Sequence, residues 1–103
     1  MGSDHMDDDI KAALDALSRQ YDHAAELIEN MSDQDAALKA ATELTEVLRL
    51  ATISAGQLRA DRVYKLWQSR HLSLSKLADV VGVSKTRAAE MINTAKKSQE
   101  DSK

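Results

Sequence analysis

The 103-residue chain contains no cysteine and no proline, and its only glycines are Gly2, Gly56 and Gly82. The absence of cysteine excludes disulfide bonds and thiol chemistry. Because proline is absent and glycine is scarce, little in the chain interrupts a helix, and alanine, leucine, lysine, glutamate and aspartate dominate the composition. We therefore expect an all-α protein, of a length that suits one compact domain or two small helical lobes.

Several functional classes lack the residues that they need. Only Tyr21, Tyr64 and Trp67 are aromatic, whereas single-strand binders stack bases on several exposed rings. No apolar run approaches membrane-spanning length and no signal peptide is visible, so we expect a soluble, cytoplasmic protein. Since no glycine-rich phosphate loop and no nucleophile motif is present, we expect neither an enzyme nor a bound cofactor.

The histidines do not form a zinc pattern. His23 stands near Asp22 and Glu26, a spacing that would hold a metal only weakly, and His71 stands alone. Neither has a second histidine or a cysteine at ligand spacing, so both are interpreted as surface residues and no metal site is predicted.

Charge is divided unequally along the chain. Residues 1–55 hold twelve acidic and four basic residues, a balance of −8, and residues 56–103 hold five acidic and ten basic residues, a balance of +5. Together the two halves give the net charge of −3. A polyanionic partner such as nucleic acid is therefore expected to meet the C-terminal half.

Apolar residues repeat at coiled-coil spacing through the first third of the chain. Residues 1–5 are typical of an expression leader, and Asp7 to Asp9 suit the start of the helix that follows. That helix carries apolar residues at alternating spacings of four and three, namely Ile10, Leu14, Leu17, Tyr21, Ala24, Ile28 and Met31. Such a seam indicates a coiled coil or a helical bundle. The polar residues 30–35 end the helix, and Ser32 is the best N-cap candidate for the next one.

A second helix is predicted from Asp33 towards Arg70. Its seam continues through Ala37, Ala41, Leu44, Leu48, Ala51, Ala55 and Leu58. The pattern fails at Arg62, and a new apolar stripe of Val63, Leu66 and Trp67 begins out of phase. We interpret this change as the point where the helix stops facing a bundle or a second subunit and starts to cover a C-terminal domain. Gly56 lies near this point, so a continuous helix and a bent helix both remain open.

The amount of apolar seam favours self-association. One seam on each of two long helices makes a thin core. Because pairing two such hairpins buries more apolar surface, we expect a homodimer through residues 10–58, either parallel or antiparallel. The predicted organisation is a leader (1–5), a coiled-coil-like helical hairpin for dimerisation (6–57), a tri-helical domain (58–97) and a disordered tail (98–103).

The stretch 72–93 predicts two short amphipathic helices on either side of Gly82. Ser73 and Ser84 are suitable N-caps, because a serine oxygen accepts a hydrogen bond from a free amide of the first turn. Gly82 can adopt the left-handed conformation that turns the chain. The inner faces carry Leu74, Leu77, Ala78 and Val81 in the first helix and Ala88, Met91 and Ile92 in the second.

This stretch resembles the helix-turn-helix of bacterial and phage repressors and of the fourth region of sigma factors. The resemblance rests on the small Ala78, the turn glycine Gly82 four residues later, and the apolar Val83, Ala88 and Met91. One departure is Ala88, which stands where the family usually has valine or isoleucine. Another is Lys76, which occupies the first turn of the first short helix, where an acidic residue would suit the helix dipole better. The resemblance implies a tri-helical domain that binds duplex DNA, with the end of the preceding long helix as its first helix.

The resemblance also assigns roles to the polar face of the second short helix. Base edges in the major groove would be read from Lys85, Thr86, Ala89, Glu90 and Asn93. Ser84 and Arg87 suit phosphates, although Arg87 could instead pair with guanine. Lys85 and Arg87 crowd the helix N-terminus, where cations oppose the dipole. A phosphate partner would explain that arrangement better than an ordinary solvated face does.

Further polar residues flank the motif. Candidates for contacts to the DNA backbone are Arg70, Ser73, Lys96 and Lys97, with Arg59, Arg62 and Lys65 in the helix before it. The same cations would also serve as solubilising surface charges, and we expect both roles among them. Tyr64 and Trp67 are interpreted as packing beneath the motif.

The sequence therefore predicts a sequence-specific double-stranded DNA-binding protein, most simply a dimeric transcriptional regulator associated with the nucleoid, with helix 85–97 in the major groove. Two alternatives share the fold. One is a protein-interaction adaptor or antitoxin-like module, for which duplex binding would be weak and without sequence preference. The other is an architectural or DNA-segregation protein, which would bind cooperatively along a duplex with several sites.

Overall fold

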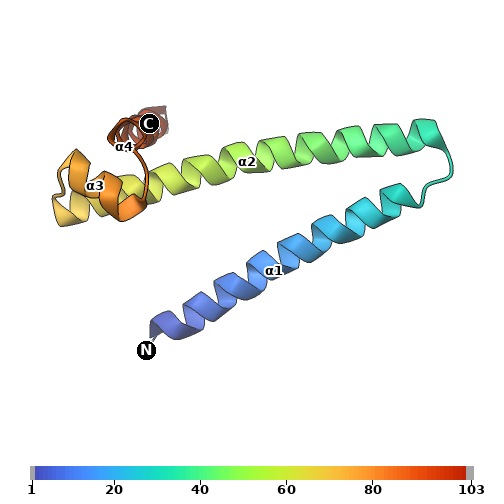
Figure 1. Ribbon diagram of the computed structural model, residues 1–103, viewed down its shortest axis with the longest axis horizontal. Helices are drawn as coiled ribbons and strands as arrows, with labels where there is room; N and C mark the ends of the chain where they lie inside the picture. Colours follow the sequence, from blue (N-terminus) through green and yellow to red (C-terminus); the bar gives the residue numbers. More distant parts are fainter. Residues whose placement is uncertain (1, 102–103) are drawn as a thin grey trace. The chain divides into compact units, whose positions relative to one another are not determined.

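The computed structural model of the chain describes residues 2–101, and these residues form four helices and no strand (Figure 1). The helices are α1 (Gly2–Glu29), α2 (Gln34–Arg70), α3 (Leu74–Val81) and α4 (Lys85–Asp101). The predicted all-α class is confirmed. Within this part of the chain, no helix combines the length and the apolar character needed to cross a membrane.

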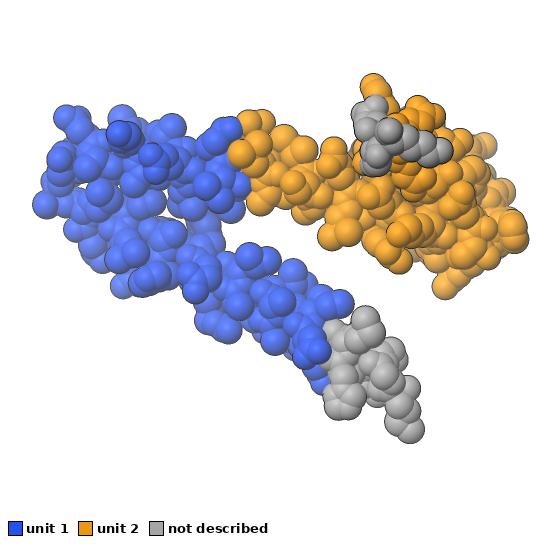
Figure 2. Space-filling view, turned by 180° about the vertical axis from the view of Figure 1, so that it is seen from behind, with its two compact units in different colours: residues 1–48 blue, residues 49–103 orange. Residues whose placement is uncertain are grey.

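The chain divides into two compact units, Met1–Leu48 (unit 1) and Arg49–Lys103 (unit 2), which Figure 2 colours blue and orange. The division falls within α2, whereas the sequence pattern placed it between residues 57 and 58. Helix α2 continues through Gly56 without interruption. Of the two alternatives that the sequence left open, a continuous helix and a helix bent near Gly56, the structure shows the continuous one.

Helix α1 begins earlier than the sequence suggested. It includes residues 2–5 of the predicted leader, while Met1 lies outside the described residues. The acidic residues Asp7 to Asp9, predicted to precede the helix, therefore lie inside it. No proline or glycine stands between residues 3 and 10 to stop the helix from extending towards the N-terminus.

The start of α2 corrects another prediction. The N-cap is Asp33 rather than Ser32, because Asp33 Oδ1 accepts hydrogen bonds from the amides of Asp35 at 3.0 Å and Ala36 at 3.4 Å. Aspartate caps a helix as well as serine does, and its charge also interacts favourably with the helix dipole. The adjacent carboxylate therefore takes the place predicted for the hydroxyl.

The apolar seam of unit 1 is only partly covered. Near the link between α1 and α2 its members are half-buried, namely Ala24, Ile28, Met31, Ala37, Ala41 and Leu44. Away from the link the seam residues Ile10, Leu14, Leu17, Tyr21 and Leu48 are exposed. Unit 1 of a single chain therefore buries the link end of the seam and leaves the remainder in contact with solvent.

Unit 2 contains the buried core. Its members are Ala60 and Val63 from α2, Leu77 and Ala78 from α3, and Ala88, Met91, Ile92 and Ala95 from α4. Tyr64, Leu66, Trp67, Leu72, Leu74, Val81 and Val83 are partly buried against it. The predicted inner faces and the packing role of Tyr64 and Trp67 are confirmed. Ala60 and Ala95 among the buried residues, and Leu72 among the partly buried ones, were not foreseen. Ala60 and Ala95 follow the same helical spacing as the predicted core residues of their helices.

Two left-handed residues close the helices of unit 2 in the same way. At the end of α2, His71 has φ 53° and the Leu72 amide donates to the Trp67 carbonyl at 3.4 Å. At the end of α3, Gly82 has φ 81° and the Val83 amide donates to the Ala78 carbonyl at 3.0 Å. Both are hydrogen bonds to the fifth residue back, which satisfy a terminal carbonyl and reverse the chain.

Helix α4 extends beyond the predicted boundary at residue 97. Residues 98–101, predicted to belong to a disordered tail, continue the helix as far as Asp101. Residues 102 and 103 of that tail lie outside the described residues. The residues involved, Ser98 to Asp101, include no glycine or proline that would end the helix sooner.

Replacing Gly82 should destabilise unit 2 through the backbone alone. No heavy atom lies within 4 Å of the position that a Cβ would occupy, so the φ of 81° is the only obstacle to a side chain. We expect Gly82→Ala to lower the free energy of unfolding by about 1–2 kcal/mol, the usual cost of a left-handed L-residue. Urea unfolding followed by the fluorescence of Trp67 measures the change.

Gly82→Asn is the matched control, because asparagine tolerates the left-handed region better than alanine does. Gly82→Asn should lower the free energy of unfolding by less than Gly82→Ala does. An alanine variant as stable as the parent protein would show that the turn does not require a left-handed residue.

Candidate nucleic-acid interface

Helix α4 is positioned by close packing against α3. These two helices pack directly against each other, and the contact buries Leu77 and Ala88 completely and Ala78 and Met91 almost completely. Alanine on both sides allows the two backbones to approach closely. Ala88, the departure from the family pattern, therefore lies in a tightly closed contact rather than over a gap.

Both predicted serine caps are confirmed. Ser73 Oγ accepts a hydrogen bond from the Lys76 amide at 3.2 Å, and Ser84 Oγ accepts one from the Arg87 amide at 3.0 Å. The two serines thus begin α3 and α4 without adding a negative charge. Neither helix has an acidic residue in its first turn, so the positive ends of both helix dipoles are left without a neutralising side chain.

The predicted site residues lie at the surface of unit 2. Arg70, Ser73, Ser84, Lys85, Thr86, Arg87, Glu90, Asn93, Lys96 and Lys97 are exposed, and Ala89 is half-buried. Eight of these eleven belong to α4 and a ninth, Ser84, caps it. One helix therefore presents most of the set to solvent.

The outermost stripe of α4 is polar. Thr86, Glu90, Asn93 and Lys97 are spaced by four, three and four residues, which places them on one face of a helix. The buried residues Ala88, Met91, Ile92 and Ala95 occupy the opposite face. The stripe therefore points away from the core, as a helix that enters a groove requires.

Arg87 and Glu90 form an ion pair on the surface of α4. The distance from Arg87 Nη1 to Glu90 Oε2 is 3.4 Å, and both side chains are largely exposed. An exposed pair of this kind contributes only about 0.2–1 kcal/mol to stability. The pair places the guanidinium beside a predicted base-reading residue and leaves it free to exchange partners at low cost.

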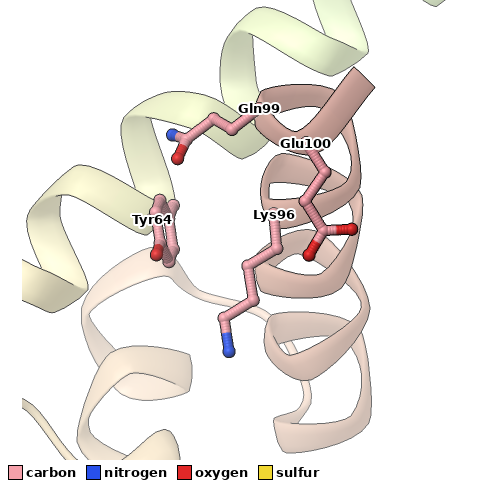
Figure 3. Close-up of a pocket in the computed structure, with 4 residues that line it drawn as sticks. All are labelled: Tyr64, Lys96, Gln99 and Glu100. Carbon is pink, nitrogen blue, oxygen red and sulfur yellow. The ribbon is translucent and has the colours of Figure 1, made fainter. Parts of the chain in front are cut away.

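Lys96 occupies a different environment from Lys97. Its ammonium lies over the Trp67 ring, 5.6 Å from the centroid, a cation–π geometry. The Trp67 ring is itself 6.0 Å from that of Tyr64, tilted by 40°. Lys96, Tyr64, Gln99 and Glu100 line an open hollow of about 230 Å³. Figure 3 shows these four side chains, with Tyr64 on α2 and the other three on α4. The sequence predicted a phosphate contact for Lys96 and did not foresee this contact with Trp67.

One further cation joins the predicted set. Lys76 is exposed in the first turn of α3, where its own amide is bonded to the cap Ser73. It repeats the arrangement of Arg87 in α4, a cation at the third helical position with no acidic residue in the same turn. That repetition in the sequence was the signal that could have identified it.

The comparisons with known proteins add no assignment to this geometry. Among the described residues, no group of three or more histidine, aspartate or glutamate side chains is arranged to hold a metal ion. The chain matches no protein-family model, no curated protein and no solved structure.

Proposed function

We propose that the chain is a sequence-specific double-stranded DNA-binding protein, most simply a homodimeric transcriptional regulator associated with the nucleoid. Residues 58–97 would form a tri-helical helix-turn-helix domain, in which the end of α2 is the first helix. Helix α4 would enter the major groove as the recognition helix.

The observation that carries the proposal is the outward face of α4. Its polar stripe lies opposite a fully buried face, and its N-terminal turn combines Ser84, Lys85 and Arg87 without an acidic residue. Cations at the positive end of a helix dipole are unfavourable unless an anion lies nearby. Glu90 lies 3.4 Å from Arg87, but the first turn itself holds no acidic residue. A DNA phosphate would supply an anion there, since backbone amides and basic side chains at a helix N-terminus bind phosphate together.

The exposed seam supports the homodimeric part of the proposal. Pairing through residues 10–58 would cover apolar side chains that unit 1 leaves exposed, among them Ile10, Leu14 and Leu17. A twofold dimer would also present two recognition helices to two half-sites, about 34 Å or a multiple of it apart.

Removing the cations at the start of α4 should weaken duplex binding. For Lys85→Ala/Arg87→Ala we expect lower affinity, and a log–log salt slope reduced in magnitude by roughly 0.9 for each phosphate that the variant no longer neutralises. Fluorescence anisotropy of a labelled duplex over a salt series measures both quantities. Arg19→Ala/Lys39→Ala removes the same charge from exposed positions of unit 1 and is the control. Unchanged affinity and slope in the α4 variant would contradict the assigned interface.

Adding a negative charge at the cap should separate folding from binding. Aspartate caps a helix as well as serine does and favours the dipole, so Ser84→Asp should leave the stability of unit 2 unchanged or slightly raised. Its carboxylate would face the phosphate position, so duplex affinity should fall. Asn30→Asp adds the same charge in unit 1 and should bind as the parent protein does. If Ser84→Asp binds equally well, DNA does not approach the N-terminus of α4.

The outward stripe should determine sequence preference. We expect Asn93→Ala and Glu90→Gln to change the bases preferred at one position of each half-site, because a good side-chain contact to a base edge contributes about 1–3 kcal/mol of discrimination. Selection of bound sequences from a random duplex pool at two salt concentrations reveals the preference and its dyad symmetry. Thr94→Ala, on the neighbouring exposed position, is the control. An unaltered consensus in both the Asn93 and the Glu90 variant would exclude base reading from this face.

A further inference from the structure

Lys96 lies between two hollows on the surface of unit 2. It lines the hollow of about 230 Å³ together with Gln99 and Glu100, near the C-terminal end of α4. It also lines a hollow of about 170 Å³ together with Ala89 and Asn93, two of the residues proposed to read bases. The direction of the Lys96 side chain therefore decides whether its charge reaches the part of α4 that is proposed to meet DNA.

The ring of Trp67 holds Lys96 on the side of the smaller hollow. The Lys96 ammonium lies 5.6 Å from the centroid of this ring, and Trp67 lines the smaller hollow together with Asn93. Figure 3 shows the Lys96 side chain running away from Gln99, towards the N-terminal half of α4. A lysine can also pair with a glutamate four residues later, the spacing at which Glu100 stands. The contact with the ring places the charge nearer to Asn93 than that pairing would.

Trp67 is itself held in place by its neighbours. It is partly buried against the core of unit 2, and its ring centroid lies 6.0 Å from that of Tyr64, at an angle of 40°. Aromatic pairs at this separation attract each other beyond the area that they bury. The Tyr64 hydroxyl in turn accepts a hydrogen bond from Gln68 Nε2 at 3.0 Å. The ring therefore presents a fixed face to the lysine.

A lysine held on a ring remains able to bind an anion. The ring attracts the ammonium from one side, while Lys96 is exposed, so N–H donors of the ammonium are left for another partner. A free lysine side chain loses much rotamer freedom when it binds, and a side chain that is already restricted loses less. Lys96 thus combines an available charge with a restricted position, which suits an anion at a fixed place.

We propose that Trp67 is a positioning residue for DNA binding, which holds the Lys96 ammonium against one particular phosphate beside the base read from Asn93. This inference rests on the proposed function and deepens it in two ways. It assigns Lys96 to a single phosphate rather than to general attraction of the duplex. It also gives Trp67 a role beyond packing, exerted through Lys96 and without contact to the duplex.

The test is a double-variant cycle on the affinity for a duplex that carries the selected consensus, measured by fluorescence anisotropy. Lys96→Gln removes the charge, so it should weaken binding and reduce the magnitude of the log–log salt slope by roughly 0.9. Trp67→Leu keeps the charge but releases it, so affinity should fall about two- to fivefold with the slope unchanged. Because Trp67 acts through Lys96, the double variant should bind as Lys96→Gln does.

Trp67→Phe keeps an aromatic ring and should restore part of the affinity that Trp67→Leu loses. It also completes the cycle with Lys96→Gln if the leucine variant does not fold, which circular dichroism on heating reveals. Lys97→Gln is the matched comparison, because it removes the neighbouring cation from the outward stripe of the same helix. Its effect should multiply with that of Trp67→Leu, whereas the effect of Lys96→Gln should not.

Duplexes in which one phosphate at a time is replaced by an uncharged methylphosphonate locate the contact. One position, beside the base whose preference changes in Asn93→Ala, should weaken binding of the parent protein and leave binding of Lys96→Gln unchanged. The effects of Trp67→Leu and Lys96→Gln might instead multiply in a parent protein that binds duplex. That result would overturn the inference and leave the proposed function standing. A parent protein that binds no duplex at any salt concentration would overturn both.

Discussion

The close packing of α3 on α4 is the constraint on which the rest of unit 2 depends. Ala88 and Leu77 are completely buried at this contact and Ala78 almost so. Interiors at this density resist even small changes in volume. Because successive residues of a helix point about 100° apart, the contact also fixes which residues of α4 face solvent. A shift by one residue would turn Asn93 towards the side of the helix and remove the stripe to which it belongs.

The start of α4 shows how a cap can stabilise a helix and leave its N-terminus positively charged. A serine cap satisfies a free amide as an aspartate would, but it leaves the positive potential of the helix terminus in place. Lys85 and Arg87 increase that potential at some expense to the helix. The buried contact behind them offsets this loss of helix stability, so the helix does not need a favourable charge at its end. Stability of this unit comes from the core, so its surface can carry charges that do not favour the helix.

How much the sequence could predict depended on how local each signal was. The helices on either side of Gly82, their caps and their inner faces were all predictable, because cap, glycine and helical spacing agree within about twenty residues. The cap at Asp33 was missed because Ser32 and Asp33 are equally good caps, and only the backbone decides between them. The contact between Lys96 and Trp67 joins residues from different helices, so no local pattern indicates it.

The two glycines within unit 2 illustrate different physical demands on the same residue type. At Gly82 the demand comes from the chain itself, through a backbone conformation that other residues adopt only at a cost. At Gly56 the backbone is helical and the surrounding space is empty, so neither conformation nor packing within the chain requires the missing side chain.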